Sequence, residues 1–222
     1  MNLIQSTLIH KILPPRSKTA GKAPALIMLH GRGADENDLF GLSEYLDERL
    51  FIVSVRAPFE FAYSGGFTWF EIEDIGKPDS KMFTESFRKL IRFFGDVNAG
   101  YPVDAEKIFL FGFSMGAMMS YAAALTHPEM VKGVIANSGL IPEGAGFTYE
   151  WNKISGKPFF VAHGKHDSIV PVSFAHRSKE LLGKAGADLT YREYEMDHQI
   201  GEESLNDIIK WIEKYLQHHT AS

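Results

Sequence analysis

The sequence of 222 residues contains no cysteine, no block of like charge and no apolar run as long as a membrane-spanning helix. The lack of cysteine excludes disulfides, thiolate metal sites and a cysteine nucleophile. A net charge of −5 without a basic patch argues against nucleic acid and anionic lipid as partners. The first ten residues lack the basic and apolar regions of a signal peptide. We therefore expect a cytoplasmic protein without a membrane span.

Short apolar runs alternate with amphipathic segments along the chain. Strands are expected at 8–13, 25–29, 51–55, 108–113, 133–136, 158–162 and 189–194, and helices at 38–46, 85–98, directly after 114, at 172–182 and at 204–216. This alternation predicts an α/β fold with a mostly parallel sheet and helices on both faces.

No linker or internal repeat divides the chain. We expect a single domain over residues 1–222, with its core at about 24–216 and a frayed tail at 217–222. The connection between the apolar runs 133–136 and 158–162 is short. It leaves no room for a large lid domain.

A G-x-S-x-G motif occupies residues 112–116, between the apolar run 108–111 and an alanine-rich helical segment. A strand, this motif and a helix are the context of a nucleophile elbow, a turn so sharp that the residues flanking the serine must be very small. The turn lifts the serine hydroxyl clear of the backbone at the edge of the sheet. We therefore predict that Ser114 is a nucleophile.

A serine hydroxyl needs a base to remove its proton, and the base needs an acid to orient it. His198 follows the strand expected at 189–194, and Asp167 follows the strand expected at 158–162. The chain order Ser, Asp, His is the order of α/β-hydrolase triads. The carboxyl ends of parallel strands lie at one edge of a sheet. The sequence therefore predicts a catalytic triad of Ser114, Asp167 and His198.

Other acidic and histidine residues near these positions allow alternative interpretations. Asp197 and Glu195 are rival acids, but a sequence neighbour of the histidine is poorly placed to reach its far ring nitrogen. His163 and His166 resemble a metal-binding pair only superficially, because no further ligands accompany them. We expect neither a metal nor a cofactor.

The triad chemistry also requires donors for the negative charge that develops on the carbonyl oxygen. The backbone N–H of Met115, directly after the serine, is one expected donor. The other is expected in the loop 30–33, and we favour the N–H of Arg32. The aromatic segment 59–70 is expected to be half core and half pocket wall, with Trp69 and Phe70 as substrate contacts.

Four ordered motifs in this chain resemble the phospholipase/carboxylesterase family of α/β-hydrolases, which includes bacterial carboxylesterases and acyl-protein thioesterases. The motifs lie at 29–33, 112–116, 163–167 and 196–198, and the resemblance runs from about 24 to about 215. It implies a single-domain, nearly lidless hydrolase of esters or thioesters without a cofactor. It also supports Ser114, Asp167 and His198 as the triad, with Arg32 and Met115 as oxyanion donors.

The chain also departs from its relatives at the oxyanion positions. Acyl-protein thioesterases usually carry a short aliphatic residue where Arg32 stands and often glutamine where Met115 stands. Backbone donors survive both changes, but long-chain acyl-protein substrates become less expected. The related dienelactone hydrolases use a cysteine, which this chain lacks.

These observations predict a serine carboxylesterase that hydrolyses short- to medium-chain or aromatic esters through an acyl-enzyme. A lysophospholipase or an acyl-protein thioesterase using the same triad remains open, as does a non-catalytic binding protein that has kept the fold. The expected partner is a small-molecule ester or thioester. A homodimer also remains open, although no residue indicates one. The sequence does not define the physiological substrate, its acyl-chain length or the stereoselectivity.

Overall fold

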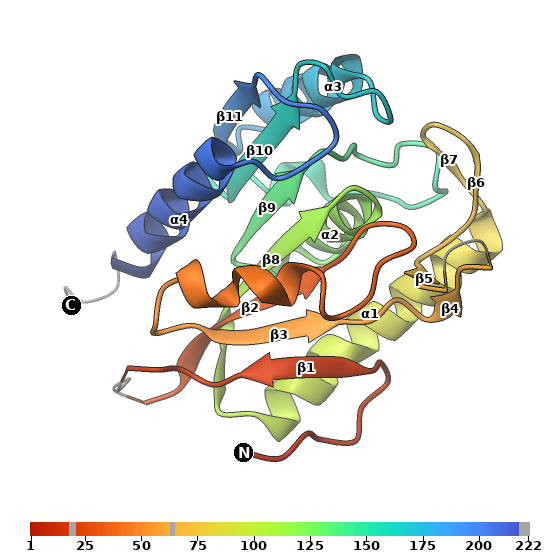
Figure 1. Cartoon of the computed structure of the whole chain (residues 1–222). Helices are drawn as coiled ribbons and strands as arrows, with labels where there is room; N and C mark the ends of the chain where they lie inside the picture. The colour runs from red at the N-terminus through yellow and green to blue at the C-terminus, as the bar shows by residue number, and fades with distance from the viewer. Residues whose placement is uncertain (18–20, 63–64, 218–222) are drawn as a thin grey trace.

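The computed structural model describes residues 1–17, 21–62 and 65–217, so the expected frayed tail lies almost wholly outside the described residues. A seven-stranded sheet crosses the molecule in the order β1-β3-β2-β8-β9-β10-β11 (Figure 1). Its strands are β1 His10–Leu13, β2 Ala23–Leu29, β3 Phe51–Val55, β8 Val103–Phe113, β9 Gly133–Asn137, β10 Pro158–Gly164 and β11 Asp188–Tyr194. Only β1 runs antiparallel to its neighbour. The prediction of a mostly parallel sheet is confirmed.

Helices cover both faces of this sheet (Figure 1). They are α1 Ser80–Gly100, α2 Met115–Thr126, α3 Val172–Lys184 and α4 Glu202–Gln217, with short 3-10 segments η1 Leu39–Tyr45, η2 Pro128–Met130 and η3 Trp151–Lys153. Successive strand residues alternate between two buried cores: Ile27 packs with α1 and α2, and Met28 packs with η1 and α4. The prediction of helices on both faces is therefore confirmed. None of the helices in the described ranges is long and apolar enough to cross a membrane.

Several elements differ in extent from the sequence prediction. Helix α1 begins at Ser80 rather than 85, because the Asp79 side chain accepts a hydrogen bond from the Met82 N–H at 2.8 Å and caps it. Strand β8 begins at Val103 rather than 108, in a polar stretch that apolar patterning does not reveal. The helix expected at 38–46 is the 3-10 segment η1.

The long connection 56–80 contains two small hairpins. They are formed by β4 Phe59–Glu60 with β5 Phe67–Thr68, and by β6 Ile72–Asp74 with β7 Lys77–Pro78. The connection 138–157 contains the short segment η3 and no strand, and all of it is described. Within the residues that the structure describes, neither connection forms a lid domain.

The strand order also locates a crevice. The chain passes from β2 to β3 on one side, and β8 then lies on the other side of β2. Ligands of open parallel sheets bind at such a switch point, beyond the carboxyl ends of the strands. In this protein those ends are Leu29 of β2 and Phe113 of β8.

Candidate active site

Ser114 lies in the sharp turn between β8 and α2. Its backbone angles are φ 54° and ψ −116°, a sparsely populated combination for a residue with a side chain. A Cβ on Gly112 would overlap the carbonyl of Gly116, and a Cβ on Gly116 would overlap the carbonyl of Leu29. The two glycines are therefore required by close backbone approach. They allow the strained serine to stand at the start of the helix.

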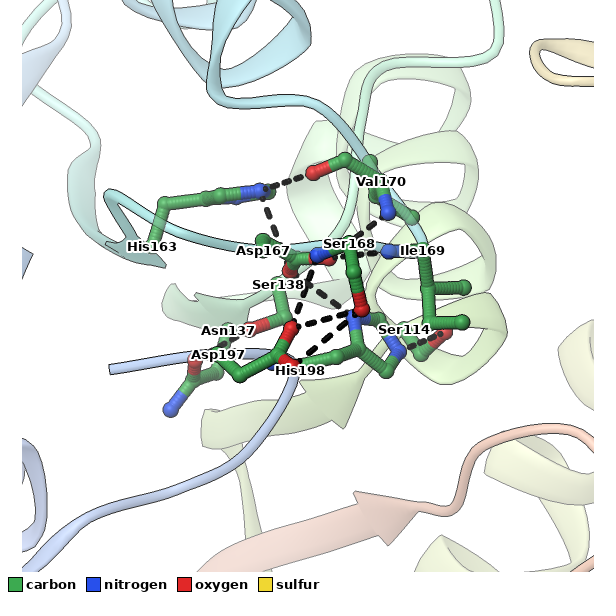
Figure 2. Close-up of polar contacts among 10 residues, drawn as sticks. All are labelled: Ser114, Asn137, Ser138, His163, Asp167, Ser168, Ile169, Val170, Asp197 and His198. Atoms are coloured by element: carbon green, nitrogen blue, oxygen red, sulfur yellow. Dashed lines mark hydrogen bonds and ion pairs between the residues drawn. The ribbon is translucent and has the colours of Figure 1, made fainter.

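The structure brings Ser114, His198 and Asp167 together, although they follow three different strands (Figure 2). The Ser114 Oγ lies 3.0 Å from the Nε2 of His198. The Nδ1 of His198 lies 2.8 Å from the Oδ2 of Asp167. With Nδ1–H donating to the carboxylate, Nε2 is free to accept the serine hydroxyl proton. The His198 side chain is 16% exposed and that of Asp167 is fully buried.

Asp167 is held by its own turn as well as by the histidine. Its Oδ1 accepts hydrogen bonds from the N–H groups of Ile169 at 3.0 Å and Val170 at 2.6 Å. The Nε2 of His163 donates to the Val170 carbonyl at 2.7 Å and lies 3.3 Å from the Asp167 Oδ2. Burial lowers the pKa of His163, which favours the neutral ring. These contacts fix the carboxylate behind His198.

The rival acids occupy other positions. The Asp197 side chain accepts hydrogen bonds from the N–H groups of Ser168 and His198, and the Ser168 N–H is the main cause of its lowered pKa. Glu195 is exposed and pairs with Lys165 and with His166. Asp167 therefore holds the histidine ring, while Asp197 holds backbone groups. Sequence reasoning treated Asp197 only as a rival and missed this second role.

The loop after β2 carries the expected second oxyanion donor. The Ala57 N–H donates to the His30 Nε2 at 3.0 Å, so His30 donates from Nδ1 to the Gly31 carbonyl at 2.6 Å. Burial lowers the pKa of His30 and keeps it neutral. Within the described part of the chain, neither the Arg32 N–H nor the Met115 N–H is engaged by a backbone acceptor. The expectation that these two groups are the oxyanion donors therefore stays a prediction.

The Arg32 side chain contacts the segment that follows β3. Its guanidinium forms an ion pair with Glu71 and lies over the Phe61 ring, 4.5 Å from the centroid. The arginine thus ties the loop after β2 to the segment carrying the first hairpin.

Trp69 and Phe70 do not lie where the sequence reasoning expected them. Both side chains are fully buried and neither lines the cleft. The Trp69 Nε1 donates to the His30 carbonyl at 3.0 Å, and Phe70 packs against Phe83. The expected substrate contacts are thus wrong, because these aromatic rings fill the core beneath the loop after β2.

A cleft of about 610 Å³ opens above Ser114. Apart from the loop after β2, its wall consists mainly of aliphatic and methionine side chains, with Phe113 as its aromatic side chain. The main apolar contributors are Ile72, Ile75, Met115, Met118, Leu140 and Ile169. The part formed by the β6–β7 hairpin was not predicted, because this polar stretch has no pattern that distinguishes it from a loop.

The described residues hold no group of three or more metal-ligating side chains in metal-binding geometry. His163 faces the Asp167 turn, whereas His166 reaches the exposed Glu195 at 2.8 Å. The two histidines therefore serve different contacts and do not form a pair.

Comparison with known proteins places this arrangement in a family. The sequence model of the phospholipase/carboxylesterase family matches residues 11–216. An acyl-protein thioesterase 1 from Candida albicans is 30% identical over 91% of this chain and 96% of its own. The carboxylesterase of Bacillus cereus is 25% identical, with a TM-score of 0.81 over 93% of this chain and 94% of its own. A carboxylesterase from Mesorhizobium loti shares the fold at 20% identity, with a TM-score of 0.83 over 95% of this chain and 97% of its own.

The family match covers nearly the whole described chain, including the elbow and the loops that carry Asp167 and His198. The fold, the order of the motifs and the relatives agree with one another. This chain belongs to the phospholipase/carboxylesterase family of α/β-hydrolases and is a serine hydrolase of that family.

Proposed function

We propose that the protein is a serine carboxylesterase that acts on short- to medium-chain or aromatic carboxylic esters through an acyl-enzyme. The observation that carries this proposal is the hydrogen-bonded chain from buried Asp167 through His198 to Ser114. It ends on a strained elbow that opens into the cleft.

The first half of the reaction acylates the serine. The Ser114 Oγ attacks the ester carbonyl carbon while the Nε2 of His198 takes its proton. The charge that moves onto the carbonyl oxygen is met by the N–H groups of Arg32 and Met115. The bond from carbon to the leaving oxygen then breaks. His198 returns its proton to the departing alcohol.

The second half releases the acid. Water enters the space left by the alcohol, gives a proton to His198 and attacks the acyl carbon. The Ser114 oxygen leaves and takes that proton back. The Asp167 carboxylate stabilises the imidazolium that forms twice per cycle.

The lining of the cleft bears on the acyl group. Its aliphatic and methionine side chains support an apolar acyl chain, bound by burial rather than by polar contacts. The aromatic-ester part of the proposal rests on Phe113, because Trp69 and Phe70 lie in the core.

A second candidate is an acyl-protein thioesterase activity on the same site. It is favoured by the 30% identity to a protein of that name across nearly the full length of both chains. A lysophospholipase would use the same residues. Matched oxygen ester, thioester and lysophospholipid substrates sharing one acyl group discriminate the three through their kcat/KM ratios.

The test of the proposal is hydrolysis of p-nitrophenyl acetate, butyrate, octanoate and palmitate by the wild type and by Ser114→Ala. We expect turnover by the wild type and a fall of about 10⁶-fold in kcat for the variant. Equal slow rates for both proteins would contradict the proposal and favour a binding protein with a hydrolase fold. A steep preference for palmitate would contradict the predicted chain length.

A further inference from the structure

The acid and the base of the triad lie on two loops that meet beyond the sheet edge. We call residues 164–170 the acid loop and residues 194–200 the base loop. The N–H of Lys165 donates to the Tyr194 carbonyl at 2.9 Å, and the N–H of His166 donates to the Met196 carbonyl at 3.2 Å. A Cβ on Gly164 would overlap the backbone of the base loop. The two loops are therefore in direct backbone contact next to the triad.

Asp197 joins these loops mainly through one of its carboxylate oxygens, Oδ1 (Figure 2). Its Oδ1 accepts the Ser168 N–H at 2.7 Å, the Ser168 hydroxyl at 2.9 Å and the His198 N–H at 2.8 Å. Ser168 directly follows the acid Asp167, and His198 is the base itself. One oxygen atom thus binds the backbone on both sides of the contact between acid and base.

The triad depends on how the acid loop and the base loop are aligned with each other. The 2.8 Å contact between Asp167 and His198 crosses from one loop to the other, and no strand pairing reaches this far along either loop. A misplacement of about 1 Å can cost about 100-fold in rate. Building on the proposed function, we propose that Asp197 is a positioning residue. Through its Oδ1 acceptor, it holds the acid loop and the base loop in the register that the reaction requires.

The geometry separates the acceptor role of Asp197 from its charge. All three donors converge on Oδ1, and Oδ2 receives only a longer contact of 3.2 Å from the Ser168 hydroxyl. An asparagine can keep an oxygen at the Oδ1 position and lose only the charge. Asp197→Asn therefore tests the charge, and Asp197→Ala tests the acceptor.

Glu195 supplies a matched control on the same base loop. It also bridges to the acid loop, through Lys165 and His166, and its side chain is 68% exposed. Exposed pairs of this kind contribute little to stability. They also join side chains and leave the backbone beside the triad unconstrained. Removing Glu195 cuts a bridge between the loops without touching the Asp197 contacts.

The experiment measures kcat and KM on one p-nitrophenyl ester for Asp197→Ala, Asp197→Asn and Glu195→Ala. We expect Asp197→Ala to lower kcat by about 10- to 100-fold with KM within about twofold, because bound substrate meets a displaced base. Asp197→Asn should stay within about threefold of the wild type, and Glu195→Ala should match the wild type. An unchanged kcat in Asp197→Ala overturns the proposal. So does an Asp197→Asn variant as slow as Asp197→Ala, or a Glu195→Ala variant equally slow.

Amide hydrogen exchange of the same variants supplies a readout that needs no substrate. The N–H groups of Ser168 and His198 lose their acceptor in Asp197→Ala. We therefore expect them to exchange at least about tenfold faster than in the wild type or in Glu195→Ala. Unchanged exchange overturns the proposal even if the protein hydrolyses none of the esters. An inactive wild type with faster exchange in the variant would instead refute the esterase function alone.

Discussion

The cleft has two walls of very different construction. The wall that carries Ser114 belongs to the seven-stranded sheet, and the Ser114 N–H donates to the Asn137 carbonyl of β9 at 2.9 Å. The other wall includes the β6–β7 hairpin, which forms a separate two-stranded sheet. Its Ile72 and Ile75 are 38% and 40% exposed. A two-stranded hairpin is marginally stable by itself. We therefore expect the sheet edge to set the chemistry and the hairpin to set the fit of the substrate.

After the loss expected for Ser114→Ala, the largest expected effect lies on the sheet side, at Asp167, the proposed acid of the triad. Asp167→Asn keeps an acceptor for the Ile169 and Val170 N–H groups but presents an amide to the Nδ1 of His198. The histidine then takes the wrong tautomer, and we expect kcat to fall by about 10⁴-fold. The measurement is ester turnover beside Asp197→Asn, which should lose no more than about threefold. A loss of less than tenfold in Asp167→Asn would remove Asp167 from the triad.

A substitution in the elbow should also have a large effect, but on the stability of the protein rather than on the rate of hydrolysis. Gly116→Ala places a methyl group against the Leu29 carbonyl, so the start of α2 must move away from β2. We expect a loss of about 3 kcal/mol in the free energy of unfolding, measured by urea denaturation. Gly95→Ala is the matched control, because nothing lies within 4 Å of its added Cβ in α1. That control should stabilise the protein by up to about 1 kcal/mol, and destabilisation of both variants alike would contradict the steric argument.

Buried histidines beneath the sheet edge predict a dependence of stability on pH. Burial lowers the pKa of His10, His30 and His163 in the folded state. As the pH falls below about 6.5, the unfolded chain takes up protons that the folded chain refuses, so the free energy of unfolding falls. His10→Gln should reduce this slope by up to about 1.4 kcal/mol per pH unit. Urea denaturation between pH 5 and 7.5 measures this pH dependence. A free energy of unfolding that stays constant toward pH 5 contradicts the prediction.

The smallest expected effect lies on the hairpin side and tests the comparison most directly. Ile75→Ala removes apolar surface from the cleft wall without touching the triad. We expect kcat/KM for the octanoate ester to fall about three- to tenfold while the acetate ester is unaffected. Ile9→Ala, an exposed residue outside the cleft lining, is the control. Equal losses of kcat/KM on both esters would indicate that the hairpin affects the chemical step rather than the fit of the acyl chain.

The parts of the site that sequence reasoning located share one physical origin. An elbow needs a particular pattern of small residues, so the G-x-S-x-G motif at 112–116 can be recognised from the sequence. Asp167 follows a strand with a continuous apolar run, and His198 follows a strand of alternating residues. Parallel strands end at one edge of a sheet. Local chemistry and strand order were therefore enough to predict that Ser114, Asp167 and His198 meet.

The parts that sequence reasoning missed depend on contacts between distant segments. Trp69 and Phe70 belong to an aromatic segment that could line a pocket, but their rings pack beneath the loop after β2. The hairpin that does line the cleft carries Ile72 and Ile75 in a stretch without strand periodicity. Asp197 looked like a rival acid, because its three donors come together only when the two loops meet.

The sequence by itself determined the alternation of strands and helices, the sharp turn at Ser114 and the order of the reactive residues along the chain. These follow from side-chain periodicity and from local backbone sterics, which act between near neighbours. The tertiary structure alone decided which aromatic rings are core, which segment walls the cleft and which donors converge on the Asp197 side chain. Those outcomes depend on packing between segments far apart in the chain, where burial and hydrogen-bond partners are set by the fold as a whole.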